Sequence, residues 1–387
     1  MDKNRRGNAQ KVICAMSGGV DSSVAAALLK RAGVDELRSS SRFANARVFD
    51  VIGVFMKFWS EPKKNGLIGS WNRCCSPEAE SRARKVAKIL NIPFYVFNFE
   101  KEFKKKIVDY FLDGYKKGIT PNPCIICNKE IKFGLLLKKA LSLDADFIAT
   151  GHYAKKIENR KKKIEYKLLK GKDRNKDQSY FLWMLNQKQL KRILFPIENY
   201  TRAEVEKLAK KFKLSPVLNV KKSLEICFVQ TTINDFLSRH IKQKPGKIVD
   251  AKGRVLGEHQ GLTFYTIGQR KGIKLPQGPY YILDKDLKKN ILIVTKNEKD
   301  LYKKELIAKN VSWISGRIPK FPLKVKIKIR YRHKPAPARL TQIYTDRKTD
   351  LHRLIKVEFD KVQRAITPGQ SVVFYRGEEL LGGGIIC

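Results

Sequence analysis

A glycine turn near the start of the chain combines residue types that bind phosphate. The segment Ser17–Ser22 (SGGVDS) follows an apolar stretch, Lys11–Ala15, and precedes an alanine- and leucine-rich stretch, Ser23–Gly33. This pattern predicts a buried strand, a turn and a helix, which together direct backbone N–H groups and the positive end of the helix dipole at an anion. The serine hydroxyls are candidate donors to phosphate oxygens, and Asp21 is a candidate Mg²⁺ ligand. We predict a nucleotide-binding loop, although the Gly-Lys-Ser/Thr of a Walker A loop is missing.

A closely spaced pair of cysteines is a candidate for thiol chemistry. Cys124 and Cys127 lie in a proline-rich segment, and a helix predicted to start near Asn128 would place Cys127 at its positive end, where the pKa of a thiol falls. A pair of this spacing is also consistent with a redox couple, half of a metal site or two packed thiols, and no second such pair completes a zinc site. Cys227 ends a short apolar stretch, which we interpret as a strand, so a buried core thiol is the simplest reading of the residue itself.

The charge of the chain points to a polyanionic partner. Its 387 residues include 81 Lys and Arg against 37 Asp and Glu, a net charge of +44, and the basic residues occur in every segment. We expect a strongly salt-dependent contact with nucleic acid, with a generally lysine-rich surface as the alternative explanation.

We see no apolar run long enough to span a membrane and no signal segment. The seven cysteines are interpreted as reduced thiols, so a cytoplasmic enzyme is expected.

The elements that would position these residues alternate between strand and helix. Strands are predicted over 48–55, 93–97 and 146–150, with helices over 76–90, capped by Ser76, and over 103–115 between them. A charged hairpin is predicted over 155–170, and Thr201 with Glu204 is predicted to form a capping box at the start of a helix that ends at Phe212. The alternation predicts an α/β fold with a doubly wound parallel sheet, whose ligands bind at the carboxyl ends of the strands. His152 follows a strand at that edge, where a polar contact is expected rather than packing. The polar residues 34–47 are interpreted as a surface insertion.

The pattern changes to short strands and turns after about residue 228. The alternating stretch 323–332 places three lysines and Arg330 on one face of a strand, and five or six such strands suggest a small closed barrel. We therefore predict three domains: a nucleotide-binding catalytic domain at 1–222, a small central β-rich domain at 223–300 and a C-terminal β-barrel at 301–387.

An ordered set of motifs resembles one enzyme family. Ser17–Ser22 resembles the PP-loop of the ATP pyrophosphatases, which cut ATP between the α and β phosphates and adenylate a substrate. With the motifs that follow, nearly the whole chain is similar to the bacterial tRNA-specific 2-thiouridylases. These motifs are Thr120–Lys129 (TPNPxxxCNK), Thr150–Ala154 (TGHYA), Lys176–Leu182 (KDQSYFL), Glu225–Phe228 (EICF) and Thr367–Gln370 (TPGQ).

The resemblance implies an activity and its chemistry. The protein would replace the C2 oxygen of the wobble uridine with sulfur in the tRNAs for Lys, Glu and Gln, after adenylation by ATP and Mg²⁺. Cys227 would carry a persulfide received from a sulfur-relay protein or cysteine desulfurase. Cys127 would be the nucleophile that liberates the sulfur and closes a disulfide with Cys227, a meeting of thiols implied by the resemblance alone. A monomer is expected.

The same resemblance implies the binding residues. The ATP site would comprise Ala15, Met16, Ser17, Gly18, Gly19, Val20, Asp21, Ser22, Met56 and Gly151. The target base, flipped out of the anticodon stack, would be lined by Asn122, Pro123 and Cys124. The tRNA contacts would be His152, Lys176, Asp177 and Gln178 in the catalytic domain and Arg330, Tyr331 and Gln370 in the barrel, which would be a tRNA-binding domain.

One residue departs from the family pattern. Cys124 stands where a well-known version of the family has Asp. As an alternative to the persulfide, Cys124, Cys127 and Cys227 would together supply three thiolate ligands to a 4Fe-4S cluster whose open iron would hold a sulfide. A different PP-loop enzyme that adenylates RNA, and a basic RNA-binding protein with an inactive nucleotide fold, are the remaining alternatives.

Overall fold

The computed structural model describes residues 9–32, 49–62, 68–70, 72, 75–160, 164–218, 220, 226–343 and 354–387. The chain divides into two compact units, one formed by 1–106 with 124–230 and the other by 107–123 with 231–387. The predicted insertion at 34–47 and Glu225 of the EICF motif lie outside the described residues. Over the described ranges, the helices are too short or too polar to cross a membrane.

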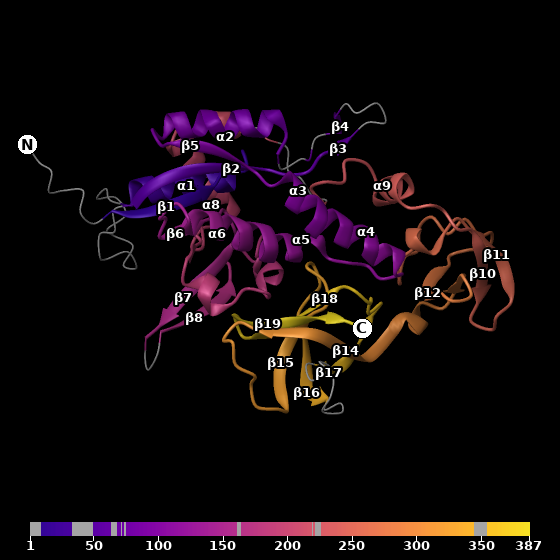
Figure 1. Cartoon of the computed structure of the whole chain (residues 1–387). Coiled ribbons are helices and arrows are strands. Elements are labelled where there is room, and N and C mark those ends of the chain that lie inside the picture. Colours follow the sequence, from indigo (N-terminus) through magenta and orange to yellow (C-terminus); the bar gives the residue numbers. More distant parts are fainter. Residues whose placement is uncertain are drawn as a thin grey trace, which may run out of the picture. The chain divides into compact units, whose positions relative to one another are not determined.

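A five-stranded parallel sheet forms the centre of the first unit (Figure 1). Val12, Ile13 and Cys14 of the central strand are at most 1% exposed, as expected of a parallel strand covered on both faces. The predicted doubly wound parallel sheet is therefore confirmed. In spatial order the strands are β5 (Phe94–Asn98), β2 (Phe49–Lys57), β1 (Gln10–Ala15), β6 (Phe147–Ala149) and β9 (Ile193–Leu194).

The direction of winding reverses at β1, and in open α/β sheets such a reversal marks the edge at which ligands generally bind. From β1 the chain runs outward to β2 and β5, then returns to the other side of β1 to form β6 and β9. Because parallel crossovers are right-handed, α1 (Val20–Arg31) and α2 (Pro77–Ile89) cover one face of the sheet and α6 (Leu136–Leu141) covers the other. The loops after β1 and β6 leave the sheet at this switch point.

Two helices begin earlier than the sequence predicts. Helix α1 begins at Val20 rather than Ser23, so Asp21 belongs to its first turn. The helix expected near Asn128 begins with α5 (Pro123–Ile126) and continues as the π-helix η3 (Cys127–Leu135), because proline is favoured at the first helical position. Cys127 therefore lies one turn inside the helix, and its predicted position at the positive helix end is wrong.

Local signals elsewhere in the first unit are confirmed. The Ser76 hydroxyl caps α2 by accepting from the Ala79 N–H, and Thr201 with Glu204 forms the predicted capping box at the start of α8 (Arg202–Lys211). The charged hairpin predicted over 155–170 consists of the paired strands β7 and β8. The remaining bounds are β3 (Glu61–Pro62), β4 (Ile68–Ser70), α3 (Glu100–Phe103), η2 (Lys104–Val108), β7 (Ala154–Asn159), β8 (Glu165–Lys170), η4 (Ser179–Leu182), α7 (Gln187–Leu190) and η5 (Ser215–Val217).

Over its described residues, the second unit contains two sheets, two α-helices and two short 3-10 helices. One sheet has the order β11-β10-β13-β12, and the other is a barrel in the order β14-β17-β16-β15-β18-β19, closed by pairing of β14 with β19. The predicted barrel is confirmed. The bounds are α4 (Asp109–Lys116), α9 (Ile233–His240), β10 (Gly246–Asp250), β11 (Val255–His259), η6 (Leu262–Phe264), β12 (Tyr281–Asp286), β13 (Ile291–Thr295), η7 (Glu298–Leu301), β14 (Tyr302–Trp313), β15 (Leu323–Lys328), β16 (Ala336–Ile343), β17 (Leu354–Arg364), β18 (Ser371–Arg376) and β19 (Glu379–Ile386).

Strand β15 shows the predicted alternation of burial, over a shorter span. Its aliphatic side chains pack into the barrel core with Val357 and Phe374, whereas Lys324 and Lys326 are exposed. The strand ends at Lys328, so Arg330 lies beyond it in a bend rather than on the charged face of the strand.

Candidate nucleotide and thiol site

The glycine loop after β1 is held in place by its neighbours. Gly18 has a φ of +71°, and a Cβ there would lie 2.1 Å from the carbonyl oxygen of Ala79, so only glycine fits. Arg82 Nε donates to the Gly18 carbonyl oxygen over 3.0 Å. The Ser17 N–H donates to Ser22 Oγ over 3.1 Å, which closes the turn on itself. The loop therefore has a fixed backbone.

The start of α1 is suited to an anion. Gly19 is the N-cap residue and has no side chain to accept from the first N–H groups of the helix, the groups that bind an anion in such turns. Ser17 is exposed and Asp21 half-buried, while Met16 and Val20 are 1% and 6% exposed. These last two side chains belong to the core, so a nucleotide would meet only their backbone.

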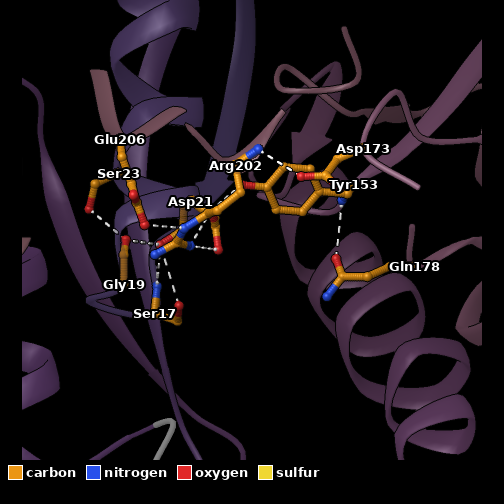
Figure 2. Close-up of polar contacts among 10 residues, drawn as sticks. Ser17, Gly19, Asp21, Ser23, Tyr153, Asp173, Gln178, Arg202 and Glu206 are labelled. Atoms are coloured by element: carbon orange, nitrogen blue, oxygen red, sulfur yellow. Dashed lines mark hydrogen bonds and ion pairs between the residues drawn. The ribbon is translucent and has the colours of Figure 1, made fainter. Parts of the chain in front are cut away.

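The Asp21 carboxylate lies between two donors from other elements, as Figure 2 shows. Tyr153, in the loop after β6, donates its hydroxyl to Asp21 Oδ1 over 2.5 Å. Arg202, the first residue of α8, approaches both carboxylate oxygens with Nη1 at 2.7 Å. Burial, reinforced by the charge of Asp21, raises the pKa of the Tyr153 hydroxyl, so it remains a donor at neutral pH. Sequence reasoning missed Arg202, whose only local signal was the capping box around it.

The loop after β6 packs directly on the nucleotide loop. A Cβ on Gly151 would lie 2.6 Å from the Ser22 nitrogen, so this position also requires glycine. Met56, the other residue outside the loop 15–22 that is expected in the ATP site, lies half-buried near the end of β2. The structure thus brings Gly151 to the loop 15–22, which the sequence order alone does not show.

The His152 side chain is packed inside the protein and is nearly inaccessible to solvent. Its ring is 8% exposed, lies 5.5 Å from the Phe133 ring and 6.3 Å from the Phe195 ring, and its Nδ1 is 2.8 Å from the Thr150 hydroxyl. Burial, with a smaller effect of Lys132, lowers the pKa of His152 well below 6.5. His152 therefore makes a polar contact, with Thr150, and is also packed, because aromatic side chains close around the end of β6. Its contact with tRNA stays a prediction.

The predicted tRNA contacts Asp177 and Gln178 lie in an ordered loop. Asp177 is 5% exposed and accepts hydrogen bonds from the Gly171 N–H and from the N–H and hydroxyl of Ser179 at 3.0–3.1 Å. These three hydrogen bonds fix the conformation of the loop around Asp177, whose contact with tRNA stays a prediction. Gln178 accepts from the Tyr153 N–H with Oε1 and donates its own N–H to the Tyr153 carbonyl oxygen. Lys176 is half-buried in the same loop.

The helix that carries Cys127 is tied to this loop. Asn128 Nδ2 donates to the Phe181 carbonyl oxygen over 3.1 Å, which connects η3 to η4. Asn128 Oδ1 is buried and has no hydrogen-bond partner among the residues that the structure describes. Cys127 is 8% exposed, whereas Cys124 on α5 is exposed.

Cys227 lies in a turn and is half-buried, so the predicted strand end is wrong at the described residues 226–228. The next residue, Phe228, packs its ring edge-on against Phe103 of α3, with centroids 5.9 Å apart. Helix α3 also contacts η3, the helix of Cys127. Both cysteine-bearing segments therefore contact the same short helix within the first unit.

The iron–sulfur alternative does not fit this arrangement. Across the described part of the chain, which includes Cys124, Cys127 and Cys227, no three His, Cys, Asp or Glu side chains are grouped as a metal site requires.

In the second unit, the TPGQ motif holds the loop that contains Asn122 and the buried Pro123. The Thr120 N–H donates to the Pro368 carbonyl oxygen over 2.9 Å, and a Cβ on Gly369 would lie 3.0 Å from the Thr120 nitrogen. Gln370, expected to contact tRNA, uses its side-chain amide within the protein, on Thr120.

The other two predicted barrel contacts also have intramolecular partners. Arg330 donates to the Ala365 carbonyl oxygen and lies 3.4 Å from the Thr367 hydroxyl. The Tyr331 ring lies beneath Lys328 Nζ, 5.6 Å from the ring centroid. Both residues are half-buried.

Comparison with protein families covers almost the whole chain. Residues 10–231 match the model described as the tRNA methyl transferase HUP domain, 234–296 the tRNA methyl transferase PRC-barrel domain, and 303–386 the aminomethyltransferase beta-barrel domain. The three matches follow the parallel-sheet, four-stranded-sheet and barrel regions described above.

Relatives similar to the chain over its full length carry one name. The chain is 45% identical over 381 residues to the tRNA-specific 2-thiouridylase MnmA of Clostridioides difficile (strain 630), covering 97% of this chain and 98% of the relative. It is 45% identical over 386 residues to that of Carboxydothermus hydrogenoformans, with 97% of each chain covered. The protein of that name from Moorella thermoacetica is 45% identical over 383 residues, covering 96% and 98%.

Proposed function

The chain belongs to the tRNA-specific 2-thiouridylase family, and we propose that it replaces the C2 oxygen of the wobble uridine with sulfur in the tRNAs for Lys, Glu and Gln. One observation supports this proposal most: the glycine loop and the helix of Cys127 belong to one unit and are connected through residues 178–181. Tyr153, which donates to Asp21, is bonded to Gln178, and Asn128 is bonded to Phe181 of η4.

ATP supplies the leaving group, and the loop 15–22 would bind its phosphates. The uridine O2 attacks the α phosphorus, the bond to the β-phosphate oxygen breaks, and pyrophosphate departs. The N–H groups at the start of α1 and the hydroxyl of Ser17 stabilise the charge that develops on the pyrophosphate. Asp21 is the residue that would hold Mg²⁺, which when bound neutralises phosphate charge. The product of this step carries AMP on O2.

Sulfur then replaces the activated oxygen. Cys227 carries a persulfide, and its terminal sulfur attacks C2 of the uracil while AMP leaves with the oxygen. The Cys127 thiolate attacks the Cys227 Sγ, the S–S bond breaks, and its electron pair remains on the sulfur of the uridine. A Cys127–Cys227 disulfide forms, and a dithiol reductant restores both thiols. A sulfur-relay protein or cysteine desulfurase supplies the persulfide.

The remaining residues would bind the RNA. We propose that Asn122, Pro123 and the exposed Cys124 line the flipped uridine, and that Lys176 contacts the RNA near the loop 173–178. The net charge of +44 supports a polyanionic substrate. We propose a monomeric, cytoplasmic enzyme with three functional regions bounded near residues 222 and 300.

The test is a complete reaction with purified components. Unmodified tRNA for Lys, Glu and Gln is incubated with the protein, MgATP and a persulfide donor, and the anticodon nucleosides are analysed by mass spectrometry. We expect 2-thiouridine at the wobble position and one AMP per thiolated tRNA. AMP without thiouridine would favour a different adenylating enzyme, and binding of tRNA without AMP would contradict an enzymatic function.

A further inference from the structure

The Asp21 carboxylate has most of its acceptor positions occupied before any nucleotide arrives. Its two oxygens offer about four lone-pair positions. Oδ1 accepts from the Tyr153 hydroxyl and from Arg202 Nη1, and Oδ2 accepts from the same Nη1 (Figure 2). These contacts leave one position, on Oδ2, which limits how Asp21 reaches a metal ion or a metal-bound water.

Arg202 is fixed at both its backbone and its side chain. Its N–H donates to Asp173 Oδ2 over 2.9 Å, and its Nε donates to Glu206 Oε1 over 2.8 Å. The side chain is 18% exposed, so the guanidinium is largely withdrawn from water. Arg202 is thus held by its backbone N–H and by Nε, and its Nη1 has a fixed position relative to the Asp21 carboxylate.

Tyr153 is fixed in the same way. Gln178 brackets its peptide group with two hydrogen bonds, from the Tyr153 N–H to Oε1 over 3.1 Å and from the Gln178 N–H to the Tyr153 carbonyl oxygen over 2.8 Å. The hydroxyl that meets Asp21 is therefore placed by the loop 173–178 and not by Asp21 alone.

The positive charge of Arg202 matters as well as its packing against Asp21. Asp21 is the only acidic residue between Ala15 and Ser22, and a bare carboxylate there would repel the phosphates of ATP. Arg202 compensates that charge at 2.7 Å in a site largely shielded from water. Glu206 is 47% exposed, so water screens its charge more effectively than that of Asp21.

We propose that Arg202 is a positioning residue of the nucleotide site: it neutralises and, with Tyr153, orients the Asp21 carboxylate, so that the phosphate loop accepts ATP. This inference rests on the proposed function only in taking ATP as the substrate. It assigns a role in ATP binding to a residue 181 positions away from Asp21 in the sequence.

The test measures ATP binding by calorimetry without tRNA, in EDTA and in saturating Mg²⁺. For Arg202→Gln we expect about tenfold weaker binding in EDTA, because a charge-assisted contact is lost and Asp21 is exposed to the phosphates. Mg²⁺ should reduce the defect, since the ion neutralises the same carboxylate. The double variant Asp21→Asn with Arg202→Gln should recover affinity in EDTA relative to Arg202→Gln alone.

Two further variants keep the test decisive. Arg202→Lys retains the charge and should bind ATP in EDTA more tightly than Arg202→Gln, even if the Gln variant is poorly folded. Arg84→Gln removes an exposed arginine of the same unit, paired with Glu80 at 2.8 Å, and should bind ATP like the wild type.

The outcomes separate this inference from the proposed function. Wild-type affinity of Arg202→Gln in EDTA, or no recovery in the double variant, would overturn the role of Arg202 while leaving tRNA thiolation intact as a proposal. Failure of the wild type itself to bind MgATP or to form AMP would instead remove the proposed function.

Discussion

The side-chain amide of Gln370 donates to the carbonyl oxygen of Thr120 over 2.9 Å, although 250 residues separate the two in the sequence. A residue expected to touch tRNA thus supports the loop expected to line the target base. Together with the contact of Gly369 against Thr120, this bond anchors the segment just before Asn122 and Pro123 to the motif before β18.

Removing that amide separates a positioning role from a contact with RNA. For Gln370→Ala we expect kcat for thiolation to fall about fivefold, because a hydrogen bond worth ~1 kcal/mol no longer holds the loop. Single-turnover assays at saturating tRNA measure this. Gln342→Ala, on β16 of the same barrel, is the control and should leave kcat unchanged. A rise in KM for tRNA with unchanged kcat would show that Gln370 acts only by contacting RNA.

The two thiols assigned to sulfur transfer should be separable from adenylation. We expect Cys127→Ser and Cys227→Ser each to lower 2-thiouridine formation by roughly 10³-fold or more, because a hydroxyl is a poor nucleophile without an activating base. Formation of AMP in the first turnover should persist in both. Cys387→Ser, at the exposed C-terminus, is the matched control. Full thiolation by either variant would contradict the persulfide route.

A substitution of Cys124 distinguishes the persulfide mechanism from the cluster mechanism. Because its side chain is exposed and the three cysteines are not grouped as a metal site, we expect Cys124→Asp to retain most thiolation activity. The measurement is activity together with iron and sulfide analysis of anaerobically purified wild type and variant. Bound iron in the wild type that disappears with activity in Cys124→Asp would establish the cluster instead.

The buried His152 should make stability depend on pH in acid. Its pKa in the folded protein lies below the ordinary 6.5, so below about pH 6.5 the unfolded chain binds a proton that the folded protein does not. Stability is therefore fully present above pH 6.5 and falls as the pH drops, by up to about 1.4 kcal/mol per pH unit for one group. Urea unfolding of wild type and His152→Gln at pH 7 and 5.5 tests this. Equal losses in the two proteins would refute the assignment.

Lys176 should contribute a phosphate contact. Replacing it by Gln should weaken binding of all tRNAs alike and reduce the slope of log Kd against log salt by about one. Fluorescence titrations between 50 and 300 mM KCl, values chosen as roughly the range over which such contacts respond, measure the slope. Lys188→Gln, on α7, is the control with an equal loss of charge. An unchanged slope would exclude a phosphate contact at Lys176.

Much of the fold follows from signals a few residues long. The Ser76 cap, the capping box of Thr201 and Glu204, and the alternation along β15 each depend on contacts between sequence neighbours, and the structure confirms each of them. Local geometry is encoded locally, since helix caps and the period of a strand need no distant partner. The same short range explains the error at Cys127, where Pro123 and not Asn128 begins the helix.

The pairing of distant residues was decided by the tertiary structure. Sheet order places the loop after β6 beside the loop after β1, and only then does Tyr153 reach Asp21; Arg202 reaches it from α8. Likewise, His152 is buried because Phe133 and Phe195 arrive from other elements. Residue types and spacing by themselves determined the parallel-sheet fold with its glycine loop, and they predicted nucleotide binding and thiol chemistry. Which charges meet, and which polar side chains are closed off from solvent, depends on packing between elements that no local pattern records.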